Sequence, residues 1–485
     1  MCRFCRYGVF VARLFLLLCT ISFILATLCR GVAQLGSASA LGAEGRWFES
    51  SHPDHFFAAF RGGSSIGRAS AFQAGCCGFE SRPPLHNWSS MSILISPRPK
   101  NRHQFGASGV EVAATSLLHG AIRITTEHTS WQRPWRMSID QYQQLGSCRA
   151  WHPGLFRQMA RCTAGMFLEF TTDSSEITLE IMLDAEPSAT RHMIDIARGV
   201  RSHVVCDEIA GDSSAQTACD GISIDIDDRH IPAFMPHDAA QISFPLSEPA
   251  TSALAGMIQL PGFAGTRHVR IWLPSLRGCV LRSLWGNGSF ISPVTPRARV
   301  LVLGDSISQG FIVGDSAYSW PSVFADTIGC EILNQSLGGA VFQPGLLWGL
   351  AQYIVPVCII VALGTNYRYE PSRPREVSTD IHRYFDELRR VWPHVPVCCI
   401  DMFWHNPDYF PPNAMSAYSQ VNTFIHAAIA QYDEMYSIDG SLLMEHSTAH
   451  LADGYVHPGK TGAAQIAQEL ALQIPQLVGA FSSKP

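Results

Sequence analysis

The residues of this sequence that could do chemistry lie in its C-terminal half. Ser306 follows Gly304 and Asp305 directly after the apolar residues 300–303, and His457 stands near the C-terminus. A serine hydroxyl is a nucleophile only when a base takes its proton, a third group orients that base, and donors hold the developing oxyanion. These residues therefore pose the question of which others converge on Ser306.

The candidate residues each follow a segment that would place them at one edge of a sheet. Residues 300–303 are a short apolar run typical of a buried parallel strand. Residues 330–333 precede the turn that contains Gly339, and residues 357–363 precede Asn366. Because ligands bind at the carboxyl ends of the strands in open α/β sheets, we expect these positions to share one site.

The order of the candidate residues resembles the SGNH (GDSL-type) superfamily of esterases and lipases: Ser306, Gly339, Asn366, and then Asp453 with His457. Each motif alone is weak, but four in this order, two of them after convincing strands, make the resemblance specific. It covers roughly residues 296 to 480.

The resemblance implies a role for each of these residues. Ser306 would attack an ester carbonyl, His457 would take its proton and return it to the leaving alcohol, and Asp453 would orient the imidazole. The oxyanion would be held by the backbone N–H groups of Ser306 and Gly339 and by the side-chain amide of Asn366. We expect no metal or organic cofactor for this chemistry.

Two positions depart from the superfamily's pattern. Tyr367 stands where an aspartate usually follows the Gly-x-Asn motif, and Asp453 lies four residues before His457 instead of three. A backbone carbonyl would have to orient His457 if Asp453 does not reach it. Gly338 is the alternative to Gly339 as a backbone donor.

The hydrophobic pattern indicates an α/β fold with a doubly wound parallel sheet over residues 296–485. Strands alternate there with segments of helical periodicity: 377–392, 414–432 and 461–472. Residues 116–290 instead alternate apolar and polar residues with period two, as in Ile177 to Leu183, which indicates an all-β sandwich of jelly-roll type. Residues 91–115 are expected to be a flexible lead-in.

This two-part layout resembles SGNH proteins with an appended N-terminal β-sandwich domain. Members of that group include esterases that act on acylated sugars and acyltransferases that tailor natural products. The resemblance therefore leaves open whether the sandwich binds carbohydrate, shapes the pocket or only packs against the catalytic domain.

The first ninety residues have an unusual composition. Apolar residues 14–28 follow three arginines and, taken at face value, form a signal peptide or membrane anchor. Residues 36–53 recur at 67–84, and the repeated Phe-Glu-Ser resembles a translated TΨC arm of a tRNA gene. We hypothesise that residues 1–90 translate tandem tRNA genes and that the natural start is Met91. The protein would then be cytoplasmic; if residues 1–30 are genuine, it would be membrane-anchored or exported.

Charge and cysteine content exclude some classes of function. The formal net charge is −5 and no basic run occurs, which argues against a nucleic-acid partner. Six of the 15 cysteines lie in residues 1–90, and the other nine are scattered, so we expect buried free thiols and no metal site.

Three functions are compatible with these observations. The first is a serine esterase that hydrolyses a carboxylic ester of a small molecule, including an acylated sugar. The second is an acyltransferase that uses the same residues but passes the acyl group to an alcohol. The third is a catalytically inactive protein whose sandwich binds a glycan.

Overall fold

The computed structural model describes residues 94–95, 109–146, 154–188, 190, 220–227, 229–234, 241–246, 265–368, 373–409 and 415–479. All of them belong to one compact unit, Cys76–Pro485. Residues 1–90, with the apolar segment and the repeat, lie outside the described residues, so a start at Met91 stays a prediction. Within the described ranges no helix is both long and apolar enough to cross a bilayer.

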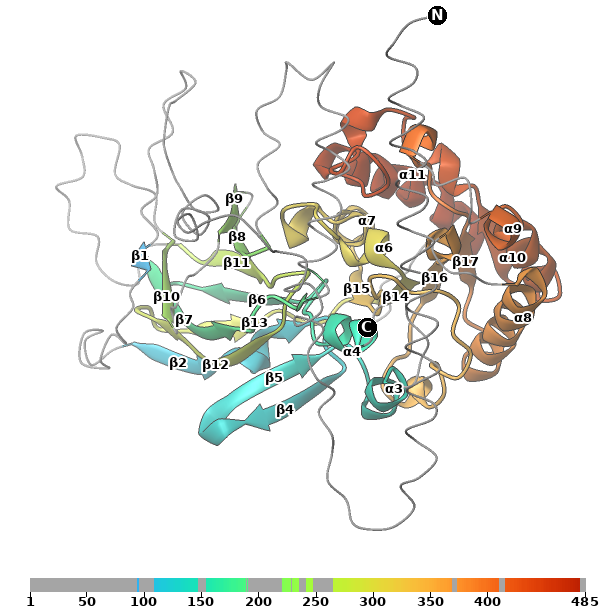
Figure 1. Ribbon diagram of the computed structural model, residues 1–485. Coiled ribbons are helices and arrows are strands. Elements are labelled where there is room, and N and C mark those ends of the chain that lie inside the picture. Colours follow the sequence, from blue (N-terminus) through green and yellow to red (C-terminus); the bar gives the residue numbers. More distant parts are fainter. Residues whose placement is uncertain are drawn as a thin grey trace, which may run out of the picture. The chain divides into compact units, whose positions relative to one another are not determined.

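The C-terminal half folds around a five-stranded parallel sheet of order β15-β14-β16-β17-β18 (Figure 1). Strands β14 to β17 are largely apolar and buried on both faces, as is usual for a parallel sheet covered by helices, whereas the edge strand β18 is partly exposed. The chain passes from the first strand to a neighbour on one side and then to a neighbour on the other, which creates a switch point beside β14. The strands are β14 (Arg299–Gly304), β15 (Glu331–Asn334), β16 (Cys358–Ala362), β17 (Val397–Ile400) and β18 (Met435–Ile438).

Helices cover both faces of this sheet, which confirms the doubly wound α/β fold (Figure 1). On one face, α7 (Trp320–Ile328) packs against α11 (Lys460–Val478). On the other face lie α8 (Pro374–Val391) and α10 (Val421–Ile429). Alternate residues of each strand therefore belong to different apolar clusters.

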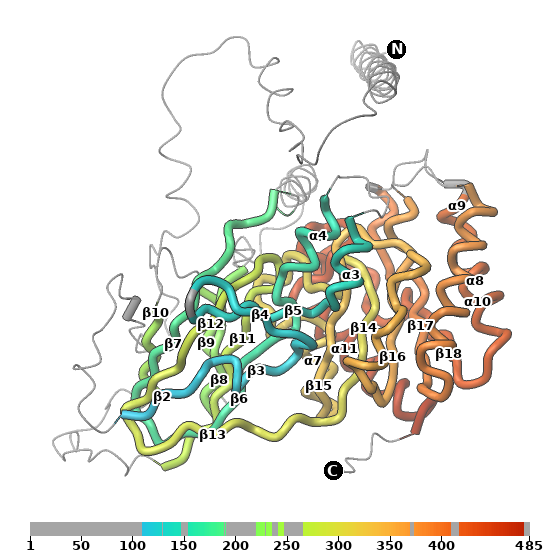
Figure 2. Tube along the Cα trace, turned by 90° about the horizontal axis from the view of Figure 1, so that it is seen from below, coloured from blue at the N-terminus to red at the C-terminus, as the bar shows by residue number. Residues whose placement is uncertain are grey.

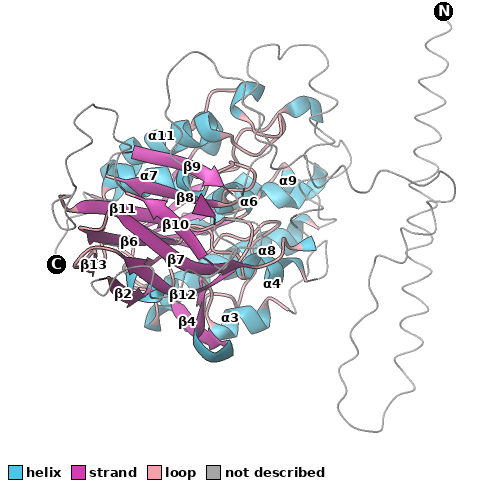
Figure 3. Cartoon of the chain, turned by 90° about the vertical axis from the view of Figure 1, so that its left-hand side faces the viewer, coloured by secondary structure: helices cyan, strands magenta, loops and turns pink. Residues whose placement is uncertain are grey.

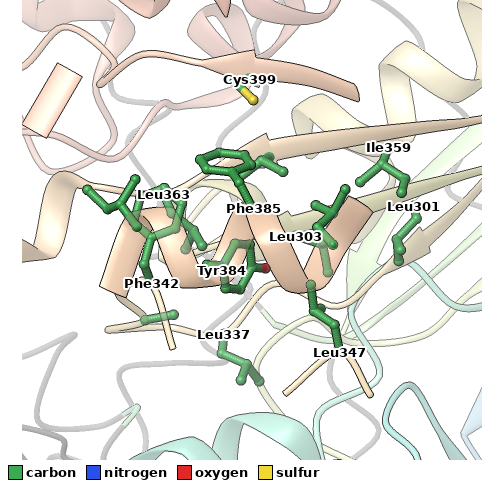
Figure 4. Close-up of a cluster of buried hydrophobic side chains, with 14 of the residues drawn as sticks. Leu301, Leu303, Leu337, Phe342, Leu347, Ile359, Leu363, Tyr384, Phe385 and Cys399 are labelled. Carbon is green, nitrogen blue, oxygen red and sulfur yellow. The ribbon is translucent and has the colours of Figure 1, made fainter. Parts of the chain in front are cut away.

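Figure 4 shows the cluster that contains α8. Leu301 and Leu303 of β14 and Ile359 of β16 lie in one buried cluster with Tyr384 and Phe385 of α8. The two-residue period of the strands and the helical spacing of α8 thus supply matching apolar faces, and this packing fixes the carboxyl end of β14.

The N-terminal part of the described chain forms two antiparallel sheets, which confirms the expected β-sandwich (Figure 3). Side chains that alternate along the strands, such as Ile177, Leu179 and Ile181, are buried in one shared cluster. One sheet contains β1 (Leu94–Ile95), β2 (Val110–Ala113), β4 (Arg123–Glu127), β5 (Trp131–Trp135), β7 (Glu176–Leu183), β10 (Gln241–Pro245) and β12 (Cys279–Gly286). The other contains β3 (Leu118–His119), β6 (Phe167–Thr172), β8 (Ile222–Ile226), β9 (Arg229–Phe234), β11 (Arg267–Trp272) and β13 (Ile291–Pro293).

Two expectations from the sequence need correction. Within the range 91–115, for which the sequence predicts a flexible lead-in, the described residues include β1, which pairs with β10, and β2, which pairs antiparallel with β12. These strands have two and four residues, too few for a recognisable alternation. The helical pattern 414–432 is two helices, α9 (Met415–Tyr418) and α10, because residues 419–420 form a turn.

One segment of the N-terminal half contributes to the apolar core of the α/β domain. Between β5 and β6 the chain forms α3 (Ile139–Gln144) and α4 (Leu155–Ala160), which lie beside the parallel sheet (Figure 2). Phe156 and Met159 of α4 are buried in the same cluster as Leu301 and Leu303. The sequence pattern had assigned this segment to the sandwich alone.

Buried charges also join the sandwich to the parallel sheet. Glu169 of β6 is fully buried and accepts hydrogen bonds from Arg270 and Arg297. His119 of β3 lies 2.5 Å from Glu331 of β15 through its Nδ1 atom. Since a buried charge that loses its partner is strongly destabilising, these pairs fix the sandwich against the α/β domain.

The cysteines of the described residues are buried free thiols, as expected. They are Cys162, Cys279, Cys330, Cys358, Cys398 and Cys399.

Candidate active site

Ser306 lies at the carboxyl end of β14 and begins the short helix α6 (Ser306–Gln309). Asp305 caps this helix, since its carboxylate accepts a hydrogen bond from the Ile307 N–H. A Cβ on Gly304 would lie only 2.6 Å from the Ser308 Cβ, so only glycine allows the helix to turn this tightly off the strand. Ser306 is largely buried at this edge of the sheet, with 7% of its surface exposed.

The structure brings Ser306, His457 and Asp453 together. The Nε2 atom of His457 lies 2.9 Å from the Ser306 Oγ, and its Nδ1 atom lies 2.6 Å from the Asp453 Oδ2. The ring of Phe311 packs against the imidazole with a centroid separation of 4.7 Å. The imidazole therefore bridges a hydroxyl and a carboxylate in the arrangement that general-base catalysis needs.

The four-residue separation of Asp453 and His457 is accommodated by a compact turn. The Oδ1 atom of Asp453 accepts hydrogen bonds from the N–H groups of Tyr455, Val456 and His457, at 2.9, 2.8 and 3.1 Å. The carboxylate thus organises the turn with one oxygen and meets the imidazole with the other. No backbone carbonyl is needed in its place.

These contacts keep the Asp453 carboxyl ionised. Burial opposes the charge, but the imidazole of His457 and the backbone N–H groups outweigh it and lower the pKa of Asp453 below its ordinary value. An ionised carboxylate is the form that can hold the Nδ1–H tautomer of His457 and stabilise an imidazolium.

The two glycines after β15 differ in how their N–H groups are used. Gly338 donates to the side-chain Oε1 of Gln309 at 2.7 Å. The N–H of Gly339 has no acceptor among the described residues, and its φ of +82° is one that glycine adopts readily. The backbone donor available to a ligand is therefore Gly339.

Asn366 lies in the turn that follows β16, and its side chain reaches the loop that follows β15. Its side-chain Nδ2 donates to the Ala340 carbonyl oxygen at 2.9 Å and to the Asp305 Oδ2 at 3.4 Å. Tyr367, which replaces the superfamily's usual aspartate, is buried in the apolar cluster beneath. The presence of tyrosine at position 367 therefore does not remove the Asn366 side-chain amide from the site.

Asp305 has an unusual environment for a carboxyl group. It is 1% exposed, and this burial raises its pKa to about 6. The Ile307 N–H and the neighbouring His457 and Arg368 lower the pKa, but their effect is smaller than that of burial. The Asp305 carboxyl group therefore changes its ionisation close to neutral pH.

We expect the Asp305→Asn substitution to make stability less dependent on pH. The pKa of Asp305 in the folded protein, about 6, exceeds the ordinary aspartate value of about 3.9, so the folded state binds this proton more tightly than the unfolded state. The resulting stabilisation is complete below about pH 4 and is lost as the pH rises through 6. Asparagine caps helices as well as aspartate and does not ionise.

Urea denaturation of both proteins at pH 4, 6 and 8 measures this effect. The free energy of unfolding of the natural protein should fall relative to that of Asp305→Asn by up to about 3 kcal/mol between pH 4 and 8. A difference that is the same at all three pH values would contradict the raised pKa.

A separate cavity of about 40 Å³ lies beneath the turn that follows β15. Its lining includes Met137 and Gln141 from the N-terminal half and Leu337 and Tyr384 from the α/β domain. Figure 4 labels the last two of these side chains. Neither Ser306 nor His457 lines it, so it is not part of the reacting centre. Within the described ranges, no cluster of three or more His, Cys, Asp or Glu side chains could hold a metal ion.

Sequence reasoning missed three residues that shape this site. Phe311 supports the ring of His457, Gln309 occupies the Gly338 N–H, and Arg136 binds carbonyls of residues 334 and 336. Gln309 is close enough to Ser306 in sequence to be suspected. Arg136 lies 198 residues before Asn334, and no motif connects them.

Comparison with known proteins adds family and fold. Residues 302–465 match the model of the GDSL-like lipase/acylhydrolase family. The chain is similar in structure to the salicylyl-acyltransferase SsfX3 from a tetracycline biosynthetic pathway, with a TM-score of 0.55 and 16% identity over 77% of this chain and 98% of that one. It is also similar to a family two carbohydrate esterase from Cellvibrio japonicus, with a TM-score of 0.50 and 16% identity over 77% and 99% of the two chains. At these identities the likeness shows a shared fold. No curated protein matches the chain.

Proposed function

We propose that this chain, whose residues 302–465 form a GDSL-like lipase/acylhydrolase domain of the SGNH type, is a serine esterase. It would cleave a carboxylic ester through an acyl-enzyme on Ser306. The observation that carries the proposal is the continuous series of contacts from the Ser306 Oγ through both nitrogens of His457 to the Asp453 carboxylate.

In the first half of the reaction, Ser306 attacks the ester carbonyl while the Nε2 of His457 takes the hydroxyl proton. The tetrahedral intermediate collapses, the leaving alcohol receives that proton from His457, and the acyl group stays on Ser306. In the second half, water gives a proton to His457 and attacks the acyl-enzyme. The second tetrahedral intermediate collapses, His457 returns that proton to the Ser306 Oγ, and the carboxylic acid is released. Asp453 stabilises the imidazolium at both stages.

The oxyanion of each tetrahedral intermediate would be bound by three donors. These are the backbone N–H groups of Ser306 and Gly339 and the side-chain amide of Asn366. The free Gly339 N–H supports this assignment, and the engaged N–H of Gly338 argues against that residue. Asn366 would exchange its 3.4 Å hydrogen bond to Asp305 for one to the substrate oxygen.

Acyl transfer is the second candidate, and the structural likeness to a salicylyl-acyltransferase favours it. The same residues would form the acyl-enzyme, but an alcohol would replace water in the second half. The likeness to a carbohydrate esterase supports an acylated sugar as one substrate class for either reaction. The complete hydrogen-bonded triad supports both enzymes over a catalytically inactive glycan-binding protein.

Partitioning of the acyl group distinguishes the two enzymes. The purified protein is mixed with p-nitrophenyl acetate or with an acetylated xyloside, and free acid and new ester are quantified with and without an added sugar or primary alcohol. An esterase releases mainly free acid with either mixture, whereas an acyltransferase forms the new ester at the expense of the acid. Absence of an acylated Ser306 peptide after acid quenching, together with no turnover of any ester, would reject the proposed function.

A further inference from the structure

We propose that Arg136, which belongs to the N-terminal half of the chain, is a positioning residue for the loop that offers the Gly339 N–H. This inference rests on the proposed function, because it assigns the loop 334–340 to the oxyanion site. We call residues 334–340 the oxyanion loop.

The guanidinium of Arg136 joins two segments through four main-chain carbonyls. Its Nη1 donates to the carbonyl oxygens of Asn334 and Ser336, at 2.7 and 2.9 Å. Its Nε and Nη2 donate to the carbonyl oxygens of Cys162 and Met159, at 2.8 and 2.7 Å. The planar guanidinium is suited to this role because its donors point in fixed directions.

The Arg136 charge is buried without a carboxylate partner among the contacts of the described residues. The side chain is 1% exposed, and burial lowers its pKa to about 10. Carbonyl dipoles alone offset the cost of burying this cation, so its hydrogen bonds must be well made. An apolar residue would fill the space without that cost, which indicates that the contacts themselves are needed.

A second contact from the same segment reinforces the first. The side chain of Gln335 donates to the main-chain oxygen of Arg136 at 2.6 Å and pairs with Gln141 at 3.0 Å. Arg136 thus binds the carbonyls on either side of Gln335, while the Gln335 side chain binds the carbonyl of Arg136. Three consecutive residues of the oxyanion loop are therefore bound to Arg136 and Gln141.

The remaining hydrogen bonds of the oxyanion loop leave one donor unused. Leu337 donates its N–H to the Gly304 carbonyl, Gly338 donates to Gln309, and Ala340 donates to the Leu337 carbonyl. Only the intervening Gly339 N–H has no acceptor among the described residues. Since donors must be held in place before charge develops, the Arg136 contacts serve the reaction by fixing this segment.

The consequence is that the N-terminal half contributes to the catalytic site although none of its residues has been assigned a reacting role. The sandwich would then be more than an appended binding module, because the segment between β5 and β6 completes the support of the oxyanion loop.

The variant Arg136→Met tests this role, and Arg133→Met is its matched control. Arg133 is also buried and lies on the same segment, but its guanidinium binds Glu127 and Asp184, away from the loop. For Arg136→Met we expect kcat for p-nitrophenyl acetate to fall roughly 100- to 1,000-fold, as for loss of one oxyanion donor, with KM changed less than threefold. Arg133→Met should keep kcat per folded molecule within about threefold while losing at least as much thermal stability.

Hydrogen exchange provides a readout that does not need activity. Amides of residues 335–340 should exchange roughly ten- to a hundredfold faster in Arg136→Met than in Arg133→Met or the natural protein. If Arg136→Met does not fold, Arg136→Lys carries the same two measurements and is expected to show a smaller loss of kcat, because an ammonium reaches fewer of the four carbonyls.

Unchanged exchange at residues 335–340, or equal kcat losses in the two arginine variants, would overturn the positioning role. Failure of the proposed function gives a different result, namely no Ser306-dependent turnover in the natural protein. In that case faster exchange confined to the loop would still establish that Arg136 holds it.

Discussion

The substitution Ser306→Ala is expected to lower kcat for short p-nitrophenyl esters by roughly 10⁶-fold, to the level that binding and the oxyanion donors alone sustain. The reason is the loss of the hydroxyl that would form the acyl-enzyme: His457 keeps its contact with Asp453 but has no hydroxyl to deprotonate. Steady-state assays and the disappearance of the acylated peptide measure the effect. KM should change little, because the hydroxyl contributes mainly in the transition state.

Ser308→Ala is the matched control for this experiment. Ser308 lies on the same short helix, and its buried hydroxyl has no hydrogen-bond partner among the described residues. Its replacement should leave kcat within a few-fold of the natural protein and should not lower stability. Equal residual activity in Ser306→Ala and the natural protein would reject Ser306 as the nucleophile.

Much of the fold was predictable because each domain has its own hydrophobic period. The alternation in Ile177, Leu179 and Ile181 predicts a sheet with one buried face, and the continuous apolar run 300–303 predicts a strand covered on both sides. Both expectations are confirmed. The positions of Ser306, Gly339 and Asn366 at strand ends followed from the same patterns.

What the sequence could not supply were the connections between the two halves. Nothing in the local pattern of β2, with four residues, indicates its pairing with β12, and the apolar side chains of α4 could equally have faced the sandwich. The link from Arg136 to the oxyanion loop depends on the packing of β5, α4 and the parallel sheet together. Tertiary context of this kind has no short-range signal.

Asp453 shows how a deviation in spacing can be absorbed by local hydrogen bonding. An additional residue between acid and base would displace the carboxylate in an extended loop. Here three backbone N–H groups bind the Oδ1 atom and fold the chain into a turn around the carboxylate. The turn brings the His457 imidazole within hydrogen-bond distance of the Asp453 Oδ2. The same carboxylate therefore shapes the turn and orients the base.

We expect Asp453→Asn to lower kcat by about 10⁴-fold, because an amide can donate to Nδ1 and so favour the tautomer that cannot accept the Ser306 proton. The carbonyl oxygen of asparagine can still accept from the backbone of the turn, so the fold should be kept. Assays of kcat against pH and denaturation curves of the same sample separate the catalytic effect from a loss of stability.

Asp401→Asn tests whether this result is specific. Asp401 is also paired with a histidine, His426, whose Nε2 lies 2.9 Å from its Oδ1, but that imidazole has no serine hydroxyl on its other nitrogen among the described contacts. Its replacement should leave kcat within about threefold, whereas comparable losses in both variants would show that the effect of Asp453→Asn is not that of an orienting acid. Both aspartates bind a histidine, but only His457 also contacts a serine hydroxyl among the described contacts. The comparison therefore tests whether the contact with Ser306 is the source of the large effect.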